Sequence, residues 1–322
     1  MGMEGEHVVA KEQGAMSLQT ALHKRIIKYL PLYLMLLPGM VYLFINSYIP
    51  MAGIIVAFKK YNVKQGIYGS PWAGLTNFIY LFKNDAFVII RNTLLYNIVF
   101  IILNIVVGVA LAIMITDVAG KKAKKLYQSS IMLPFLVSVV IVSYIVFAFL
   151  GAESGMINKG ILEPLGYKPI AWYQEPRYWP FILIFVNLWK GVGYGCLIYI
   201  AGIAGIDKSF YEAAQLDGAS RWQQVCSITL PHLVPTIITL LLLSVGRIFY
   251  SDFGLFYQVP QNSGALFHVT NTIDTYVYRA LISAGGIGRS GAAGLFQSII
   301  GFFLVMLSNL IVRKASSENA LF

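Results

Sequence analysis

Long apolar stretches alternate with polar segments along the chain. Six of these stretches reach the roughly 20 residues that an α-helix needs to cross the hydrocarbon core of a bilayer. They lie near 29–49, 92–116, 129–150, 180–206, 233–257 and 291–312. The pattern predicts an all-α polytopic membrane protein with six transmembrane helices in a lipid bilayer.

The composition supports a membrane protein and argues against a nucleic-acid-binding protein and a metal-binding site. The 322 residues are 57% hydrophobic and 12% charged, whereas soluble domains average about 25% charged residues. The net charge of +10 also suits a nucleic-acid-binding protein. Basic cytoplasmic loops of a membrane protein explain the same charge, so we infer no nucleic-acid partner. The two cysteines and four histidines have neither disulfide nor metal-ligand spacing, and we expect no metal site.

The distribution of lysine and arginine predicts the orientation. Four lysines in the short segment 121–125 follow the second stretch, and the positive-inside rule places them in the cytoplasm. Basic residues at 24–28 and 313–314 agree, so both termini are expected to be cytoplasmic. The basic segment 50–91 argues the other way, but the rule acts mainly through short loops. We expect a cytoplasmic head, a membrane domain and a cytoplasmic tail, over 1–28, 29–313 and 314–322.

The polar loop over 207–232 predicts two short helices separated by a turn. Ser209 with Glu212 three positions later has the spacing of a capping box, which predicts a helix start. Gly218 fits the left-handed position that ends a helix. Ser220 with Gln223 is a second capping box. The first helix exposes too little apolar surface to form a core, so it is either an interfacial connection between spans or a helix that inserts into a groove of a partner.

This loop is similar at each motif position to the EAA loop of ABC-importer permeases. The matching residues are Glu212, Ala213, Ala214, Gly218, Ile228, Leu230 and Pro231. In that family the loop forms a coupling helix that docks on an ATPase subunit. The resemblance implies that the contact with the ATPase is made by Ser209, Phe210, Glu212, Ala213, Ala214, Asp217 and Gly218.

Other segments resemble the sugar-importing branch of that family. Segments 70–78 and 91–94 are similar to the external segment of sugar-type permeases, and 246–260 and 273–279 resemble the LplB-type oligosaccharide branch. The resemblance implies a MalF-like, type I ABC importer permease fold in the bacterial plasma membrane. It also implies a heterodimer with a second homologous permease, two ATPase subunits, an extracellular sugar-binding protein and an oligosaccharide substrate.

The chain has no G-x-x-x-x-G-K-[ST] phosphate loop, and it lacks nucleophile-elbow and HExxH motifs. We therefore expect a pore-forming subunit that is not itself an enzyme and has no catalytic residues. No cofactor is expected in this chain, and ATP with Mg would be bound by the partner ATPase subunits.

Ionisable residues inside the predicted spans are candidates for a polar pathway. Lys190, Arg247 and Asp252 are placed by helical rise in the outer half of the bundle, where they either line the sugar pathway or pair to hold the bundle together. Nearby aromatic residues could stack on a sugar or belong to the interfacial belt. The candidate pathway residues are Lys190, Tyr194, Arg247, Tyr250, Asp252, Phe253 and Tyr257. Alternating glycines at 191, 193 and 195 permit close helix packing or local unwinding.

The alternative function is a secondary transporter or channel driven by an ion gradient. It would explain the spans and the charges within them. It does not explain the EAA spacing, and it predicts proton-relay carboxylates in the spans, where only Asp252 qualifies.

Overall fold

The computed structural model describes residues 28–283 and 286–315, and the chain divides into two compact units, residues 1–55 and 56–322. The expected cytoplasmic head (1–28) and tail (314–322) lie almost entirely outside the described residues. Within the described part the chain is helical, with one isolated β-bridge between Lys59 and Trp72.

The described part of the first unit belongs to a long apolar helix. It is described from Lys28 and runs through a π turn (Phe44–Tyr48) and α2 (Ile49–Met51) into a 3-10 segment (Ala52–Phe58). Pro50 lies two residues beyond the end of the π turn. Proline has no N–H to donate to the carbonyl one turn back, and a π turn is a common local adjustment at such a site.

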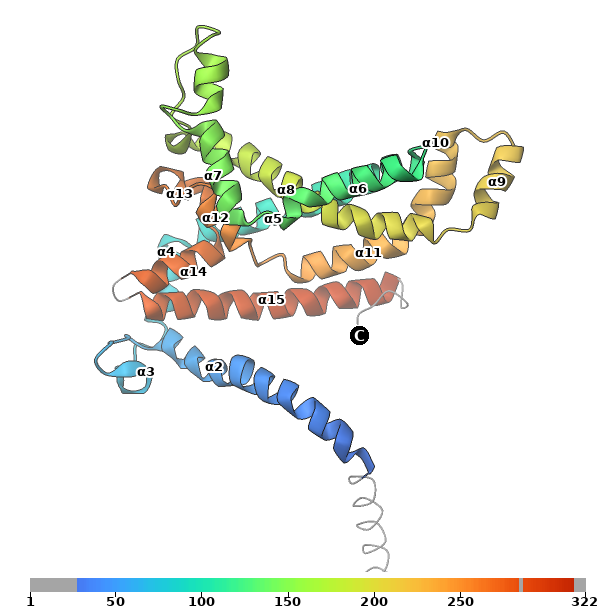
Figure 1. The fold of residues 1–322 in the computed structure, drawn as a ribbon. Helices are drawn as coiled ribbons and strands as arrows, with labels where there is room; N and C mark the ends of the chain where they lie inside the picture. The colour runs from blue at the N-terminus through green and yellow to red at the C-terminus, as the bar shows by residue number, and fades with distance from the viewer. Residues whose placement is uncertain (1–27, 284–285, 316–322) are drawn as a thin grey trace, which may run out of the picture. The chain divides into compact units, whose positions relative to one another are not determined.

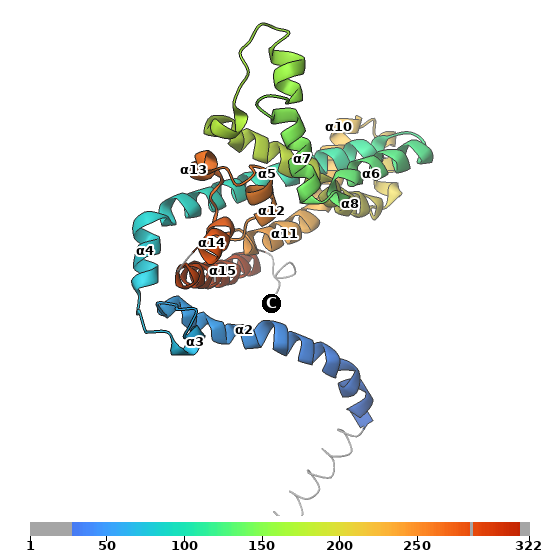
Figure 2. The same ribbon diagram turned by 60° about the vertical axis from the view of Figure 1, so that its left-hand side comes forward.

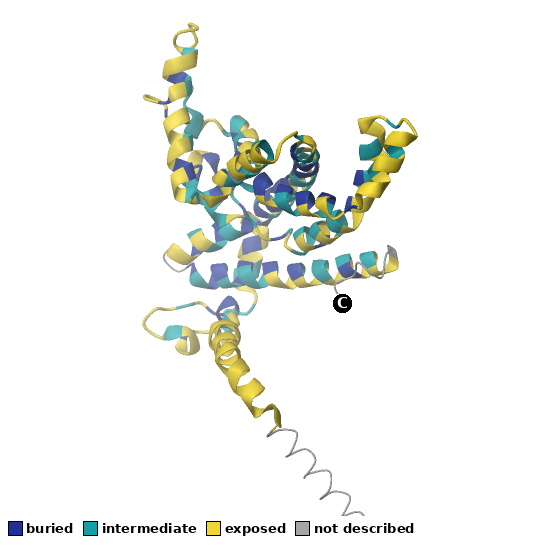
Figure 3. Ribbon diagram, turned by 45° about the vertical axis from the view of Figure 1, so that its right-hand side comes forward, coloured by how far each residue is buried: buried dark blue, intermediate teal, exposed yellow. Residues whose placement is uncertain are grey.

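Four long helices of the second unit lie side by side (Figure 1). They are α5 (Ala86–Asp117), α8 (Trp179–Ala204), α11 (Leu230–Gly246) and α15 (Ile287–Ala315). A core cluster joins α5, α8 and α11 through residues such as Ala112, Tyr199 and Leu233. Buried positions gather where these helices meet (Figure 3). The shorter elements are α3 (Gly66–Gly69), α4 (Thr76–Asn84), α6 (Lys121–Leu136), α7 (Val139–Leu150), α9 (Lys208–Leu216), α10 (Arg221–Gln224), α12 (Phe253–Gln258), α13 (Phe267–Thr270) and α14 (Ile273–Ile282).

Counting by length and apolar composition confirms the predicted number of spans. Five helices in the described residues are long and apolar enough to cross a membrane, and a bent pair makes six if it counts as one span. That pair is α6 and α7, joined at 93° where a straight span over 129–150 was predicted. Figures 1 and 2 both show α7 turning away from α6. The lysines at 121–125, expected in a loop, form the first turns of α6.

The fifth predicted span, 233–257, is also corrected. Its helix begins at Arg221, continues through a π turn (Val225–Thr229) into α11, and ends at Gly246. Arg247 to Asp252 are therefore not helical, and the chain becomes helical again only at α12. The helix ends here because side chains from distant helices bind the backbone groups beyond it, as described below.

Candidate functional site: a coupling loop and a cavity between the spans

The coupling loop begins at Asp207. This residue is the N-cap of α9, and its Oδ1 accepts a hydrogen bond from the backbone N–H of Ser209 at 2.9 Å. Hydrogen bonds from Ser209 lower the pKa of the Asp207 carboxyl below its usual value. The predicted capping box between Ser209 and Glu212 is therefore wrong, because both residues already lie within the helix.

Gly218 closes the same helix in the predicted left-handed conformation, with φ of 77°. The Ala219 N–H donates to the carbonyl of Ala214 at 2.8 Å, and the Gly218 N–H donates to that of Gln215 at 3.1 Å. These two bonds form a Schellman motif, in which a left-handed residue lets the chain satisfy the last helical carbonyls. The second predicted capping box, between Ser220 and Gln223, is confirmed.

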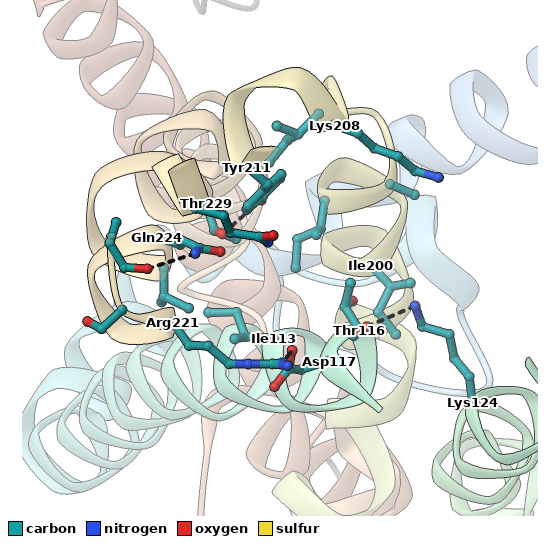
Figure 4. Close-up of a pocket in the computed structure, with 17 residues that line it drawn as sticks. Ile113, Thr116, Asp117, Lys124, Ile200, Lys208, Tyr211, Arg221, Gln224 and Thr229 are labelled. Atoms are coloured by element: carbon teal, nitrogen blue, oxygen red, sulfur yellow. Dashed lines mark hydrogen bonds and ion pairs between the residues drawn. The ribbon is translucent and has the colours of Figure 1, made fainter. Parts of the chain in front are cut away.

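Three contacts attach the loop to the spans. The Tyr211 hydroxyl lies 2.9 Å from Oγ1 of Thr229, and the Phe210 ring lies 5.3 Å from the imidazole of His232. Arg221 forms an ion pair with Asp117 at the end of α5. The first and third of these contacts border a cavity of about 810 Å³, in which Figure 4 shows Tyr211 beside Thr229 and Arg221 beside Asp117. The loop is thus linked to both α5 and α11.

The outer surface of the loop is exposed and partly apolar. Leu216 is 90% exposed and Trp222 72%, while Phe210 is 52% exposed. Of the seven residues expected at the ATPase contact, six are exposed and Ala214 is half-buried; the exposed six are Ser209, Phe210, Glu212, Ala213, Asp217 and Gly218. This surface has the size and chemistry of a helix that binds in a groove.

A second cavity, of about 620 Å³, lies among α5, α8, α11 and the segment that follows α11. The structure brings four of the candidate pathway residues to it: Tyr194, Arg247, Tyr250 and Asp252. Arg247 is exposed, and among the described residues its guanidinium has no hydrogen bond or ion pair. Asp252 is the N-cap of α12, and its Oδ1 accepts from the Leu255 N–H at 3.1 Å.

Sequence reasoning missed several polar residues of this cavity. They are Asn97, Asn104, Asn187, Ser244 and Ser251. The Asn104 side-chain amide donates to Oδ1 of Asn187 at 2.9 Å, which links α5 to α8. The available signal was the presence of three asparagines within long apolar stretches, because uncharged polar residues in spans also mark helix contacts and cavities.

The other three candidate residues lie elsewhere. Lys190 donates from Nζ to the carbonyls of Phe135 at 3.2 Å and Val137 at 2.9 Å. It therefore satisfies carbonyls at the break between α6 and α7. Phe253 and Tyr257 stack with ring centroids 4.9 Å apart and pack on Tyr278 of α14. These contacts attach α12 to α14.

Known proteins resemble this chain over most of its length. A family model described as the binding-protein-dependent transport system inner membrane component matches residues 104–316. Protein LplB of Bacillus subtilis (strain 168) is 34% identical over 289 residues, covering 89% of this chain and 90% of that protein. The polygalacturonan/rhamnogalacturonan transport system permease protein YteP of the same organism is 35% identical, covering 89% of each.

A solved structure agrees with these relatives. It is a bacterial ABC transporter involved in the import of the acidic polysaccharide alginate, with 32% identity and a TM-score of 0.83 over 92% of this chain and 99% of that chain. This likeness confirms the expected type I permease fold. The chain therefore belongs to the family of binding-protein-dependent transport system inner membrane components, the permeases of ABC importers.

Proposed function

We propose that this chain forms half of the translocation pore of an ATP-driven oligosaccharide importer. The observation that carries the proposal is the exposed coupling helix α9, which presents Phe210, Glu212 and Leu216. Tyr211 of α9 and Arg221 of α10 link the coupling loop to the spans. A second homologous permease would complete the pore. Two ATPase subunits, which bind ATP and Mg, would dock on the coupling loops, and this chain would have no cofactor or ATPase activity of its own.

The mechanism follows from the links between the loop and the spans. Tyr211 holds α9 to Thr229, next to the start of α11, and Arg221 holds the loop to the end of α5. Both α5 and α11 line the cavity that contains Arg247 and Tyr250. A movement of α9 driven by an ATPase would therefore shift two walls of that cavity, and it would favour an inward-open or an outward-open state.

We propose a sugar-binding protein as the extracellular partner and place the coupling loop and both termini in the cytoplasm. Lys124 donates to the carbonyl of Thr116 beside the coupling loop (Figure 4), so the basic start of α6 and this loop lie at the same end of the spans. The positive-inside rule assigns that end to the cytoplasm.

Cysteine labelling tests this orientation. In a Cys226→Ser background, Gly160→Cys should react with an impermeant maleimide in intact cells, whereas Lys122→Cys should react only after lysis. Both positions are exposed, so a difference in labelling reports sidedness rather than burial. Native Cys196 is fully buried and gives a low background. Labelling of Lys122→Cys and protection of Gly160→Cys would reverse the orientation.

The cavity between the spans supports an acidic oligosaccharide as the substrate. Arg247 presents there a guanidinium that is unpaired within the described residues, and guanidinium binds carboxylates through two parallel hydrogen bonds. The names of two similar proteins mention polygalacturonan and alginate, which are both acidic polysaccharides. Asp252, the one carboxylate that lines the cavity in the described part of the chain, uses one oxygen to cap α12.

Replacing Arg247 tests this assignment. Arg247→Gln should lower uptake of uronate oligosaccharides about ten-fold or more, because a charge-assisted bond contributes more than a neutral one. Uptake of a carboxyl-reduced oligosaccharide should change little. The matched control is Arg177→Gln, an exposed arginine outside the cavity. The measurement is uptake by proteoliposomes that contain the whole importer. Equal uptake of the acidic sugar by wild type and Arg247→Gln would exclude this role for Arg247.

A further inference from the structure

The break between α11 and α12 forms part of the wall of the cavity. Arg247, Tyr250, Ser251 and Asp252 all come from this non-helical segment, and all four line the cavity. Within a membrane bundle, peptide groups outside a helix must find partners in the protein or in the water of a cavity, because lipid offers none. Non-helical backbone between spans is therefore tolerated only where such partners satisfy it.

Side chains from three distant helices supply those partners, residue by residue. Asn97 of α5 donates from Nδ2 to the carbonyls of Ile248 at 2.8 Å and Tyr250 at 3.0 Å. Gln297 of α15 donates from Nε2 to the carbonyl of Phe249 at 2.8 Å. Asp274 of α14 accepts at Oδ2 from the backbone N–H of Ser251 at 2.7 Å. Every residue from Ile248 to Ser251 therefore has a backbone group bound by a side chain.

Asp274 is the centre of this network. Its Oδ2 also lies 2.8 Å from Oγ of Ser251, and its two oxygens lie 3.2 and 3.1 Å from Nε2 of Gln297. Asp274 does not itself line the cavity, and among the described residues it forms no ion pair. The backbone N–H of Ser251 and the side-chain NH₂ of Gln297 can only donate, and a carboxylate, which only accepts, suits both. The single proton of the Ser251 hydroxyl is shared between Asp274 and Oγ1 of Thr272, which lies 2.7 Å away.

We propose that Asp274 is a positioning residue for substrate. It orders Gln297 and the segment 248–251, and through that segment it holds Arg247 and Tyr250 toward the cavity. This inference rests on the proposed role of the cavity as the sugar pathway. In Asp274→Asn the side chain keeps nearly the same volume, but an NH₂ donor replaces one acceptor oxygen. That NH₂ group would point at another donor, either the side-chain NH₂ of Gln297 or the backbone N–H of Ser251. The fold should therefore persist while the segment loses its fixed conformation.

A double-mutant cycle tests this role in proteoliposomes that contain the whole importer. Asp274→Asn should lower sugar uptake about ten-fold, in line with loss of hydrogen bonds to a charged group. Complex yield and ATP hydrolysis without the binding protein should stay near wild type. In a background that already carries Arg247→Gln and Tyr250→Ala, adding Asp274→Asn should lower sugar uptake by less than about two-fold. The effects of substitutions are not additive when one residue acts through the others.

The outcomes separate the two proposals. If Arg247→Gln and Tyr250→Ala transport normally, the proposed pathway through this cavity is wrong. If those variants are impaired but Asp274→Asn transports normally, or its effect is fully additive with theirs, the positioning role is wrong. If the Asp274→Asn complex assembles in reduced amount but each assembled complex transports at the wild-type rate, the role of Asp274 is purely structural. Should the Asn variant fail to assemble, Ser251→Ala removes one partner of Asp274 and should show the same non-additivity. Glu163→Gln, an exposed carboxylate paired only with Lys159 among the described residues, is the matched control.

Discussion

Gly218→Val should abolish most sugar uptake while leaving the six spans folded. Gly218 has a positive φ of 77°, and a β-branched residue in that conformation costs about 1 kcal/mol or more. A Cβ at this position meets nothing within 4 Å, so the penalty comes from the backbone alone. Valine would therefore break the Schellman closure and misplace α9. The measurement is uptake together with ATP hydrolysis stimulated by the loaded binding protein, in the same proteoliposomes.

Gly218→Asn is the matched control for this experiment. Asparagine tolerates the left-handed conformation better than other residues with a Cβ, and the site has room for its side chain. We expect it to retain most of the uptake and the stimulation. Normal coupling in the valine variant would remove the loop from the mechanism. Equal losses in both variants would assign the defect to the added side chain instead of the backbone.

Gly193→Ala should destabilise the membrane domain markedly. A Cβ at Gly193 would overlap the backbone carbonyl of Ile131 and lie 3.3 Å from the Met132 nitrogen, so α6 and α8 touch at their backbones here. Backbone cannot yield as a flexible side chain can. Overpacking in a core typically costs about 1–3 kcal/mol, and we expect a lower melting temperature and a lower yield of assembled complex.

The neighbouring glycine provides the control. A Cβ at Gly195 meets nothing within 4 Å, although the residue lies in the same helix and in the same alternating series. Gly195→Ala should therefore have the melting temperature of the wild type. The measurement is a thermal scan of the detergent-purified complex. If Gly193→Ala also melts at the wild-type temperature, the prediction is wrong, and the backbone contact between α6 and α8 does not contribute to the stability of the bundle.

The coupling loop could be predicted from the sequence in most respects, but not at its start. Gly218, with one capping-box pattern before it (Ser209 and Glu212) and one after it (Ser220 and Gln223), indicated a short helix, a glycine turn and a second helix, since a left-handed turn and a capping box are local features. The N-cap was assigned to Ser209 although it is Asp207. Both residue types cap helices, and local sequence alone did not decide between them.

The cavity between the spans was predicted only in part. Arg247 and Asp252 were expected to share one cavity and do line it, but Lys190 was expected with them and instead binds carbonyls at the bend between α6 and α7. Hydropathy does not reveal such a bend, because apolar residues continue through it. The Lys190 side chain points toward the break between α6 and α7 because carbonyls there accept its hydrogen bonds.

The thickness of the bilayer and the spacing of the EAA residues were sufficient to predict an all-α chain with six spans and a coupling loop. Both are local constraints, since one acts on the length of each helix and the other on a short helix and its turn. Where the fifth helix ends was decided by tertiary structure. Asn97, Asp274 and Gln297 satisfy the backbone of 248–251 from α5, α14 and α15. These partners satisfy backbone groups that the helix no longer pairs, and nothing within the sequence of the segment itself specifies them.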